Sequence, residues 1–435
     1  NHLKLGHHFP IVRGEDIKKV WTLRKAGLGL LSNITGDSKP VAVIEDTAVD
    51  VNDLPAFIIE FNKILKQKKL SCVHYAHAAT GELHLRPILN LKTEHGNKLF
   101  KSVATEIAFL VKKYKGSLSG EHGDGRLRGE FLPFMIGEKN YQFCKELKDA
   151  WDPNGIFNPG KIVDTPAMNT FLRFMPDYTT RDFETTFSFK KDLGILRAAE
   201  KCNGSGDCRK TEVSGGTMCP SYMVTREEKH TTRARANILR EVLSDPKELN
   251  PFENQEIKEV MDLCLACKGC KAECPSNVDV AKLKMEFLYQ YQKEKGLPLR
   301  SWLVGNFAKI SNLASYVPFL YNVVMGTPAI RRISNVVVGF HPDRTMPLMA
   351  KQTLWSWIKS HRSPMQEKSV YLFVDEFTNF NDAEIGRTTV LLLERLGYEV
   401  KTIPHPISGR AYLSKGMLDE ARVLAMQNVR LWSSL

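Results

Sequence analysis

The sequence predicts a multidomain α+β protein. We expect an antiparallel sheet with helices, then an α-helical, cysteine-rich module, then the start of an α/β domain. Three observations predict this order. Residues 1–165 alternate strand-like and helix-like apolar patterns, seven of the nine cysteines fall between Cys202 and Cys274, and a strand–helix–strand pattern begins near residue 369. A length of 435 residues is enough for about three domains.

The first region, residues 1–165, is predicted to hold the sheet. Apolar residues at helical spacing predict helices over residues 55–68 and 98–115, the second closed by Gly116 in the C′ position. Extended, apolar-rich runs predict strands over residues 40–46, 71–75 and 82–88. Two helices with strands between them favour an antiparallel sheet backed by helices.

The remaining regions follow from changes of pattern. Residues 166–194 lack periodicity and are predicted to be a linker, and residues 195–295 form the helical cysteine module. In that module Thr225 and Glu228 have the spacing of a capping box that opens a helix. Residues 296–365 alternate apolar stretches with basic residues, which indicates core helices or a membrane-surface contact. Residues 366–435 begin a βαβ pattern that the chain does not complete.

Composition excludes several classes of protein. Hydrophobic residues make up 43% and charged residues 25%, which excludes a disordered or collagen-like chain. Clustered cysteines in odd number indicate metal or cluster ligation in a reducing compartment. The net charge of +12 is spread along the chain without basic–aromatic motifs. It therefore indicates a basic surface, or docking to an acidic partner or membrane, and no nucleic acid partner.

The ends of the sequence and its hydropathy indicate whether it is part of a longer polypeptide and whether it crosses a membrane. The sequence opens at Asn1 without an initiator methionine and closes without a stop signal, so we expect a piece of a longer polypeptide. No run of 18 apolar residues free of charge occurs, and no membrane-spanning helix is predicted.

Four cysteines form the strongest motif in the sequence. Cys264, Cys267 and Cys270 are separated by two residues each, and Cys274 follows after three more and precedes Pro275. Three thiolates at this spacing can wrap one [4Fe–4S] cluster, and in two-cluster ferredoxins the displaced fourth Cys ligates the other cluster. Zinc sites more often use two separated Cys pairs. The motif therefore favours an iron–sulfur cluster over zinc.

A second set of cysteines lies upstream, with Ser205 at the position where the same spacing would require Cys. Crossed ligation distributes the ligands over two clusters: Cys264, Cys267, Cys270 and Cys219 on the first, and Cys202, Cys208 and Cys274 on the second. Seven cysteines cannot fill eight positions. We therefore expect one complete [4Fe–4S] cluster and a second that has three Cys ligands or is absent, and upstream thiols that are only structural are the alternative.

Histidines and a glutamate in the first region could form a metal site. His77 and His84 would face opposite sides of one unbroken strand, but Gly81 between them allows a bend. Glu121 and His122 lie side by side in a loop with three glycines. Two His and one Glu match a catalytic divalent-metal site with open positions, which leaves His122 as a base.

These motifs resemble a known family. Residues 1–165 resemble the C-terminal half of FAD-linked oxidases of the vanillyl-alcohol oxidase type, such as D-lactate dehydrogenase, the glycolate oxidase flavoprotein subunit and D-2-hydroxyglutarate dehydrogenase. The Gly-Glu121-His122-Gly-Asp-Gly loop and the Asn158-Pro-Gly-Lys161 ending carry this resemblance. Residues 195–290 are similar to the ferredoxin-like iron–sulfur subunits of glycolate oxidase and anaerobic glycerol-3-phosphate dehydrogenase. From residue 369 onward the chain resembles the cysteine-rich domain of those subunits.

The resemblance implies a role for each matching residue. His77, His84 and Glu121 would be metal ligands, and His122 the catalytic base. Arg24 and Lys39 would contact the substrate carboxylate, which suits side chains that are cationic at neutral pH. Asn158 and Lys161 would contact the flavin, most of whose binding site lies outside this chain. The family usually has Gly-Asp-Gly between its histidines and a Thr after its arginine, whereas this chain has Ala79-Thr80-Gly81 and Leu28; these departures bear on the acid's side chain.

The resemblance further implies an FAD- and iron–sulfur-dependent enzyme with a divalent metal, expected to be zinc. Its reaction would oxidise a D-2-hydroxy acid (D-lactate, glycolate or D-2-hydroxyglutarate) to the 2-oxo acid. Electrons would pass through [4Fe–4S] to an external acceptor, either a protein or a quinone. We expect a cytoplasmic protein, with peripheral contact to the inner membrane left open. The alternative is an electron-transfer or assembly piece, similar to the glycerol-3-phosphate dehydrogenase iron–sulfur subunit and not catalytic alone.

Overall fold

A computed structural model describes residues 11–31 and 33–435. The first ten residues, which contributed to the expectation of a longer polypeptide, lie outside the described part. The chain forms two compact units. The first contains the residues up to 183 together with 189–205 and 274–278, and the second contains 184–188, 206–273 and 279–435. The finer division into five regions expected from the sequence stays a prediction.

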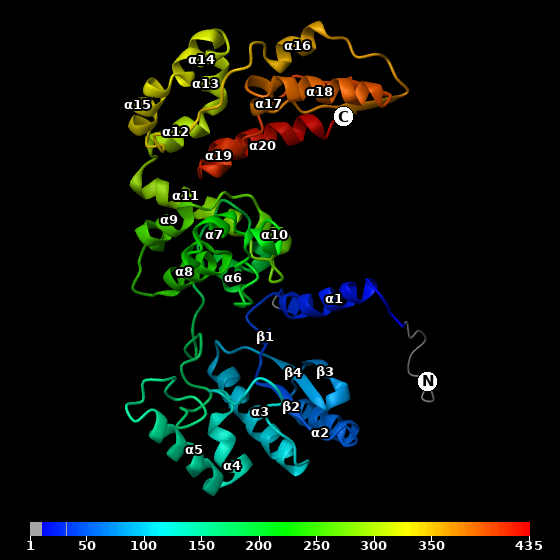
Figure 1. The fold of residues 1–435 in the computed structure, drawn as a ribbon, viewed down its shortest axis with the longest axis vertical. Helices are drawn as coiled ribbons and strands as arrows, with labels where there is room; N and C mark the ends of the chain where they lie inside the picture. The colour runs from blue at the N-terminus through cyan, green and yellow to red at the C-terminus, as the bar shows by residue number, and fades with distance from the viewer. Residues whose placement is uncertain (1–10, 32) are drawn as a thin grey trace. The chain divides into compact units, whose positions relative to one another are not determined.

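An antiparallel sheet is the centre of the first unit (Figure 1). Its strands are β1 (Lys39–Pro40), β2 (Ile44–Ala48), β3 (Cys72–His77) and β4 (Glu82–Leu89). The three other strands all pair with β4. Strand β1 pairs with the C-terminal end of β4, and β2 pairs with its N-terminal half. The single strand predicted over residues 40–46 is therefore interrupted. Val43 donates its N–H to the carbonyl of Val41 instead of to β4, which bulges the chain between β1 and β2.

Two helices contribute to the core with the sheet, as the sequence predicts. Helix α2 (Leu54–Gln67) buries Phe57, Phe61 and Leu65, which recur every four residues and so share one face. Helix α3 (Glu94–Lys113) begins at the N-cap Thr93, whose side chain accepts the N–H of Gly96. Its buried face includes Phe100, Val103, Ile107 and Val111. These side chains join Leu83, Leu85 and Leu89 of β4 in one apolar core.

The end of α3 differs from the prediction. The left-handed residue is Lys115, with φ of 53°, and not Gly116. Gly116 is required for a different reason, because a Cβ there would lie 2.3 Å from the carbonyl oxygen of Ala48. The remaining helices of the unit are α1 (Asp16–Leu31), α4 (Leu132–Ile136), α5 (Glu138–Trp151) and α6 (Ile195–Glu200), with short 3₁₀ turns at Ala78–Thr80, Gly129–Phe131 and Lys190–Asp192.

The second unit is mainly helical. Its helices are α7 (Pro220–Thr225), α8 (Thr232–Ser244), α9 (Gln255–Asp262), α10 (Gly269–Glu273), α11 (Val280–Lys295), α12 (Leu299–Gly305), α13 (Phe307–Ala314), α14 (Pro318–Gly326), α15 (Pro328–Val338), α16 (Leu354–Ser360), α17 (Glu376–Phe380), α18 (Ala383–Arg395), α19 (Arg410–Ser414) and α20 (Leu418–Trp432). Three 3₁₀ turns lie at Glu212–Ser214, Glu228–His230 and Pro251–Glu253. The capping-box prediction is wrong: Thr225 ends α7, and α8 begins at Thr232 with Thr231 as its N-cap.

The last seventy residues contain the predicted βαβ pattern. Strands β5 (Lys368–Tyr371) and β6 (Tyr398–Lys401) are parallel and α18 connects them. An antiparallel sheet with helices, a helical module and this parallel pair confirm the predicted fold class. No helix among the described residues combines the length and the apolar character that crossing a membrane requires.

A network of buried and partly buried charges joins the segment before β1 to α6 within the first unit. Arg197 of α6 donates two hydrogen bonds to the carboxylate of Asp37, at 2.7 and 2.8 Å. Lys92 donates to Asp37 and to Glu200, both at 2.8 Å. The hydrogen bonds from Arg197, together with Lys92, outweigh the effect of burial and lower the pKa of Asp37 from 3.8 to about 2.

We predict that Asp37→Asn lowers the free energy of unfolding at pH 7 by about 2 kcal/mol, because the lowered pKa of Asp37 is a favourable interaction in the folded state. Since the folded pKa lies below the unfolded one, this contribution is complete above pH ~4 and disappears as the pH falls toward ~2. Urea unfolding at several pH values measures it. Asp16→Asn, in an exposed ion pair with Lys19, is the control and should change little. Equal losses in the two variants would contradict the prediction.

Candidate active site and cluster ligands

The hairpin of β3 and β4 brings the two predicted histidines together. His77 pairs with Glu82 across the hairpin, and His84 lies two residues beyond Glu82 on the same face of β4. Their ring centroids are 5.1 Å apart. Gly81 closes the turn with φ of 72°, where a Cβ would lie 1.9 Å from the carbonyl oxygen of Val49. The bend expected at Gly81 is therefore a chain reversal that no other residue fits.

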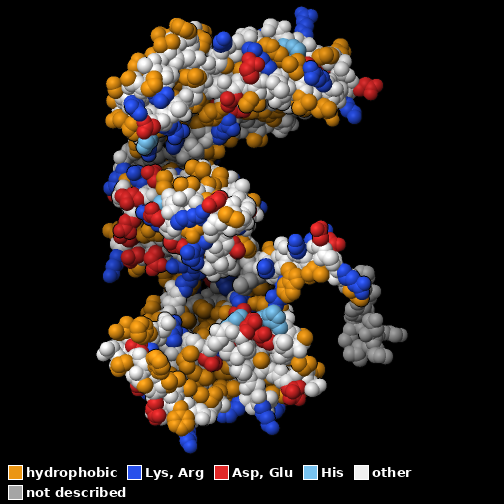
Figure 2. Space-filling model, in the orientation of Figure 1, with side chains coloured by type: hydrophobic (Ala, Val, Ile, Leu, Met, Phe, Trp, Pro, Cys, Tyr) orange, Lys and Arg blue, Asp and Glu red, His pale blue; other side chains and the backbone are white. Residues whose placement is uncertain are grey.

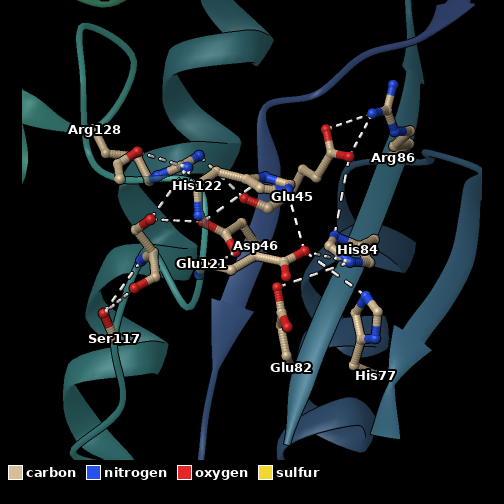
Figure 3. Close-up of polar contacts among 12 residues, drawn as sticks. Glu45, Asp46, His77, Glu82, His84, Arg86, Ser117, Glu121, His122 and Arg128 are labelled. Atoms are coloured by element: carbon tan, nitrogen blue, oxygen red, sulfur yellow. Dashed lines mark hydrogen bonds and ion pairs between the residues drawn. The ribbon is translucent and has the colours of Figure 1, made fainter. Parts of the chain in front are cut away.

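Glu121 lies among three imidazoles (Figure 3). Its Oε1 is 3.7 Å from Nε2 of His77, 3.6 Å from Nε2 of His84 and 3.1 Å from Nε2 of His122. His84 is buried, whereas His77, Glu121 and His122 are accessible to solvent. Figure 2 shows His and acidic side chains gathered on the visible face of the first unit. The four residues predicted as metal ligands and base thus form one cluster.

The buried carboxylate of Asp46 holds the loop that carries Glu121 and His122. It accepts the backbone N–H groups of both residues, at 2.8 and 2.9 Å, and the hydroxyl of Ser119 at 2.6 Å. Arg128 donates to it at 3.1 Å. Burial alone would raise the pKa of Asp46, but these hydrogen bonds lower it to about 2. Asp46 has φ of 80° at a bulge in β2, and this conformation turns it toward the loop.

The cluster contains more negative charge than its cations neutralise. Glu45 pairs with Arg86 and Asp46 with Arg128, but Glu82 and Glu121 pair with no Lys or Arg among the described residues. Burial, with the neighbouring carboxylates of Asp46 and Glu121, raises the pKa of Glu82 to about 7.

Two polar atoms at the centre of this cluster, Nδ1 of His84 and Oε1 of Glu82, are buried without a hydrogen-bond partner in the described part of the chain. Imidazole nitrogens and carboxylate oxygens are ligands for divalent cations. Four of these side chains, His77, Glu82, His84 and Glu121, offer ligand atoms within 4.8 Å of one another. The unpaired atoms, the donor set and the surplus charge fit a divalent cation at this position.

The four other predicted contacts lie at different places. Arg24 on α1 approaches the cluster, with Nη2 3.0 Å from Nε2 of His77. Lys39 is on β1 opposite Leu89, beside a cavity of about 320 Å³ also lined by Arg86, Arg173 and Lys201.

Asn158 and Lys161 are exposed in the loop after α5. That loop is joined to the Glu121–His122 loop by a hydrogen bond from the N–H of Ile162 to the carbonyl of Gly125. Only Arg24 of the four contacts the histidine cluster directly.

The first predicted cluster has its ligands around one cavity of the second unit. Cys219, Cys264, Cys267 and Cys270 all line it. The Sγ of Cys219 accepts the N–H of Thr232 at 2.9 Å, and burial raises its pKa to about 11. Ala266 and Lys268 are left-handed, with φ of 54° and 60°, and wrap the chain around the cavity. Four thiols in such a wrap fit a [4Fe–4S] cluster.

The second predicted set is divided between the units. Cys202 and Cys274 belong to the first unit, and Cys208 belongs to the second. Cys208 accepts the N–H of Arg233 on its Sγ at 3.4 Å. Ligation of a second cluster by these residues stays a prediction.

Five further residues of the site were not predicted from the sequence: Glu45, Asp46, Glu82, Arg86 and Arg128. One signal was available for Glu82, because it alternates with His84 along a strand and must therefore share its face. Asp46 carried no such signal, since its inward direction depends on a bulge that only the pairing with β4 reveals.

Comparison with known proteins agrees with this architecture. Residues 6–162 match the family model of FAD linked oxidases, C-terminal domain, and residues 201–279 match a 4Fe-4S dicluster domain. The chain thus combines an FAD-linked oxidase C-terminal domain with a 4Fe–4S module, as its motifs indicated.

Individual relatives extend this likeness along the chain. D-2-hydroxyglutarate dehydrogenase of Escherichia coli is 30% identical over 458 residues, which cover 93% of this chain and 44% of the relative. D-2-hydroxyglutarate dehydrogenase of Pseudomonas putida is 30% identical over 471 residues, which cover 98% of this chain and 46% of that relative. The glycolate oxidase subunit GlcD of Bacillus subtilis is 26% identical over 144 residues, which cover 33% of this chain and 30% of that relative. The chain spans less than half the length of these curated relatives.

We predict that Asp46→Asn weakens divalent-metal binding by roughly 10–100-fold, because an amide cannot accept both N–H groups that hold Glu121 and His122. Competition with a chelating dye measures the affinity for Zn²⁺. The matched control is Asp50→Asn, because Asp50 is exposed and lies two residues after the end of β2. Unchanged affinity in Asp46→Asn would show that the loop does not depend on this carboxylate.

Proposed function

We propose that the complete protein oxidises a D-2-hydroxy acid to the 2-oxo acid and passes the electrons through iron–sulfur clusters to an external acceptor. The observation that carries this proposal is the convergence of His77, His84 and His122 on Glu121, with Arg24 beside His77. Relatives named D-2-hydroxyglutarate dehydrogenase, glycolate oxidase subunit and D-lactate dehydrogenase support this class of substrate.

His77, His84 and Glu121 would hold the divalent metal, which we propose to be zinc. A metal at that position would supply Lewis-acid chemistry that makes the substrate hydroxyl more acidic, and bound FAD would supply the hydride acceptor. Asn158 and Lys161 are the proposed flavin contacts of this chain. They lie in the exposed loop that a hydrogen bond joins to Gly125.

His122 is the proposed general base, taking the hydroxyl proton of the substrate on Nε2. Its Nδ1 lies 3.9 Å from Oδ2 of Asp46. Because hydrogen bonds keep Asp46 anionic at neutral pH, its carboxylate would stabilise the protonated imidazole. The same carboxylate fixes the backbone of His122, so one residue orients the base and balances its charge.

Arg24 is the proposed carboxylate contact beside the metal ligands. A guanidinium offers two parallel N–H groups to a carboxylate and stays charged at neutral pH. Lys39 is the second proposed contact. It lines the cavity that also contains Arg86, and Arg86 pairs with Glu45, 3.9 Å from His84. The ion pair between Arg86 and Glu45 therefore connects this cavity to the histidine cluster.

Cys219, Cys264, Cys267 and Cys270 are the proposed ligands of the first [4Fe–4S] cluster, and Cys202, Cys208 and Cys274 of the second. The acceptor is a protein or a quinone. Peripheral membrane contact would favour a quinone, and helices α14 and α15 support it. Phe319 and Ile333 are 81% and 68% exposed there, and residues 299–338 contain no Asp or Glu. We propose a reducing, cytoplasmic location for these thiols.

The alternative function is an electron-transfer or assembly piece that is not catalytic alone. It is favoured by the four cysteines around one cavity, because an iron–sulfur cluster held there would transfer electrons and carry out no chemistry on an organic substrate. Purified protein that is brown but lacks flavin would support this alternative, and bound flavin would count against it.

Dye reduction by the full-length polypeptide with D- and L-2-hydroxy acids tests the proposed function. We expect turnover with a D-acid and much less with its L-enantiomer. Absence of stereoselective turnover with every acid would exclude the dehydrogenase proposal.

We predict that His122→Ala lowers kcat by roughly 10²–10⁴-fold, the usual contribution of a general base. Stopped-flow flavin reduction measures the chemical step directly. His95→Ala, at an exposed position in α3, is the control and should leave kcat unchanged. Near-normal flavin reduction in His122→Ala would remove its assignment as base.

We also predict that a chelator abolishes turnover and that Zn²⁺ restores it, because His77, His84 and Glu121 would lose their metal. Iron analysis before and after treatment checks that the clusters stay intact. Glu121→Gln should require a higher Zn²⁺ concentration for recovery than the unchanged protein. Full activity with less than one divalent metal ion per chain would contradict a catalytic metal.

A further inference from the structure

Two cations are buried beside the cavity that Cys219, Cys264, Cys267 and Cys270 line. Arg235 of α8 is 2% exposed and itself lines the cavity. Lys284 of α11 is 7% exposed, and its Nζ lies 2.6 Å from the carbonyl oxygen of Cys264. Both side chains belong to the same unit as these four cysteines.

The polar partners of these two cations are all uncharged. Arg235 donates to the carbonyls of Val260 and His230, at 3.0 and 2.7 Å, and to the hydroxyl of Ser221 at 3.1 Å. Lys284 donates to the carbonyls of Cys264 and Asp262. Within the described residues, neither cation has a carboxylate oxygen within 4.0 Å, although many other Lys and Arg side chains do.

Burying a charge without a counter-charge is costly, so an anion is expected nearby. Carbonyl dipoles at the end of α9 account for part of the stabilisation, since Val260 and Asp262 belong to its last turn. They do not explain why two cations, from α8 and α11, are buried around one cavity. A [4Fe–4S] cluster with four thiolates is an anion, and it gains one further negative charge on reduction.

We infer that Arg235 and Lys284 are the counter-charges of this cluster and raise its reduction potential, so that it accepts electrons more readily. The physical reason is Coulombic: a fixed positive charge in a medium of low dielectric constant favours the more negative, reduced state. This inference rests on the proposed role of the four cysteines. It goes beyond that role because it assigns a function to two residues that ligate nothing.

The test is a redox titration of the full-length protein and of four variants, followed by electron paramagnetic resonance. Lys284→Met removes the charge and keeps the length of the side chain, and Lys284→Arg keeps the charge. Lys293→Met, at an exposed position of the same helix, is the matched control. Arg235→Gln is the second charge-removing variant. The cluster in question is the one whose signal Cys270→Ala abolishes.

At a fixed ambient potential we expect the ratio of reduced to oxidised cluster to fall about tenfold in Lys284→Met, a shift of about 59 mV for a one-electron couple. A similar fall is expected in Arg235→Gln. Lys284→Arg and Lys293→Met should match the unchanged protein. Equal potentials in all forms that retain the cluster would overturn the inference while leaving the proposed function intact.

Loss of iron from a variant is a second test of whether the positive charge is needed. If both neutral variants lose iron while Lys284→Arg retains it, the positive charge is needed as a counter-charge, which supports the inference. If Lys284→Arg also loses iron although its circular dichroism is unchanged, shape and not charge is required, and the inference fails. Absence of the cluster from the unchanged protein would overturn both the inference and the proposed ligation.

Discussion

The candidate active site depends on one buried carboxylate. Asp46 receives the N–H groups of Glu121 and His122, the hydroxyl of Ser119 and the guanidinium of Arg128. A loop with three glycines has little conformational preference of its own, so its geometry must be imposed from outside. Asp46 imposes it from β2, whose register is fixed by β4. The positions of the predicted base and of one metal ligand therefore both depend on the pairing of two strands.

The central position of β4 explains how distant residues meet. Its alternation places Glu82 and His84 on one face, and pairing with β3 adds His77 to that face. Pairing of β2 with the same strand sets Glu45 opposite His84. A slip of one residue in either register would turn these side chains to the other face of the sheet. The apolar core of α2, α3 and β4 thus stabilises the site as well as the fold.

Sequence patterns predicted the elements with local signals and missed those that depend on pairing. Helix α2 follows from Phe57, Phe61 and Leu65, whose spacing is visible in the sequence. The interruption between β1 and β2 is not visible, because it arises from a register shift against β4. Similarly, Gly116 was identified as special, but its role is a close approach to Ala48 and not a left-handed cap.

The same distinction holds for the residues of the candidate site. His77, His84, Glu121 and His122 carry motifs, and the structure brings all four together. Their supporting residues have no motif, since Asp46 and Arg128 act through the backbone of other residues. The position of Lys39 likewise had no local signal in the sequence. Its register on β1 places it beside a cavity that Arg86 also lines, and Arg86 pairs with Glu45 next to His84.

The two candidate cofactor sites are electrostatically incomplete in opposite senses. In the first unit, Glu82 and Glu121 have no Lys or Arg partner among the described residues, so these two carboxyl groups of the histidine cluster lack a counter-charge. In the second unit, Arg235 and Lys284 are buried with uncharged partners only, so the cysteine cavity lacks negative charge. A divalent cation would compensate the first surplus, and an anionic iron–sulfur cluster would compensate the second. Because each surplus is unfavourable by itself, binding of each group should stabilise the unit that holds it. The charges of the polypeptide therefore favour a cation in the first unit and an anion in the second, in agreement with the motifs that first suggested the two cofactors.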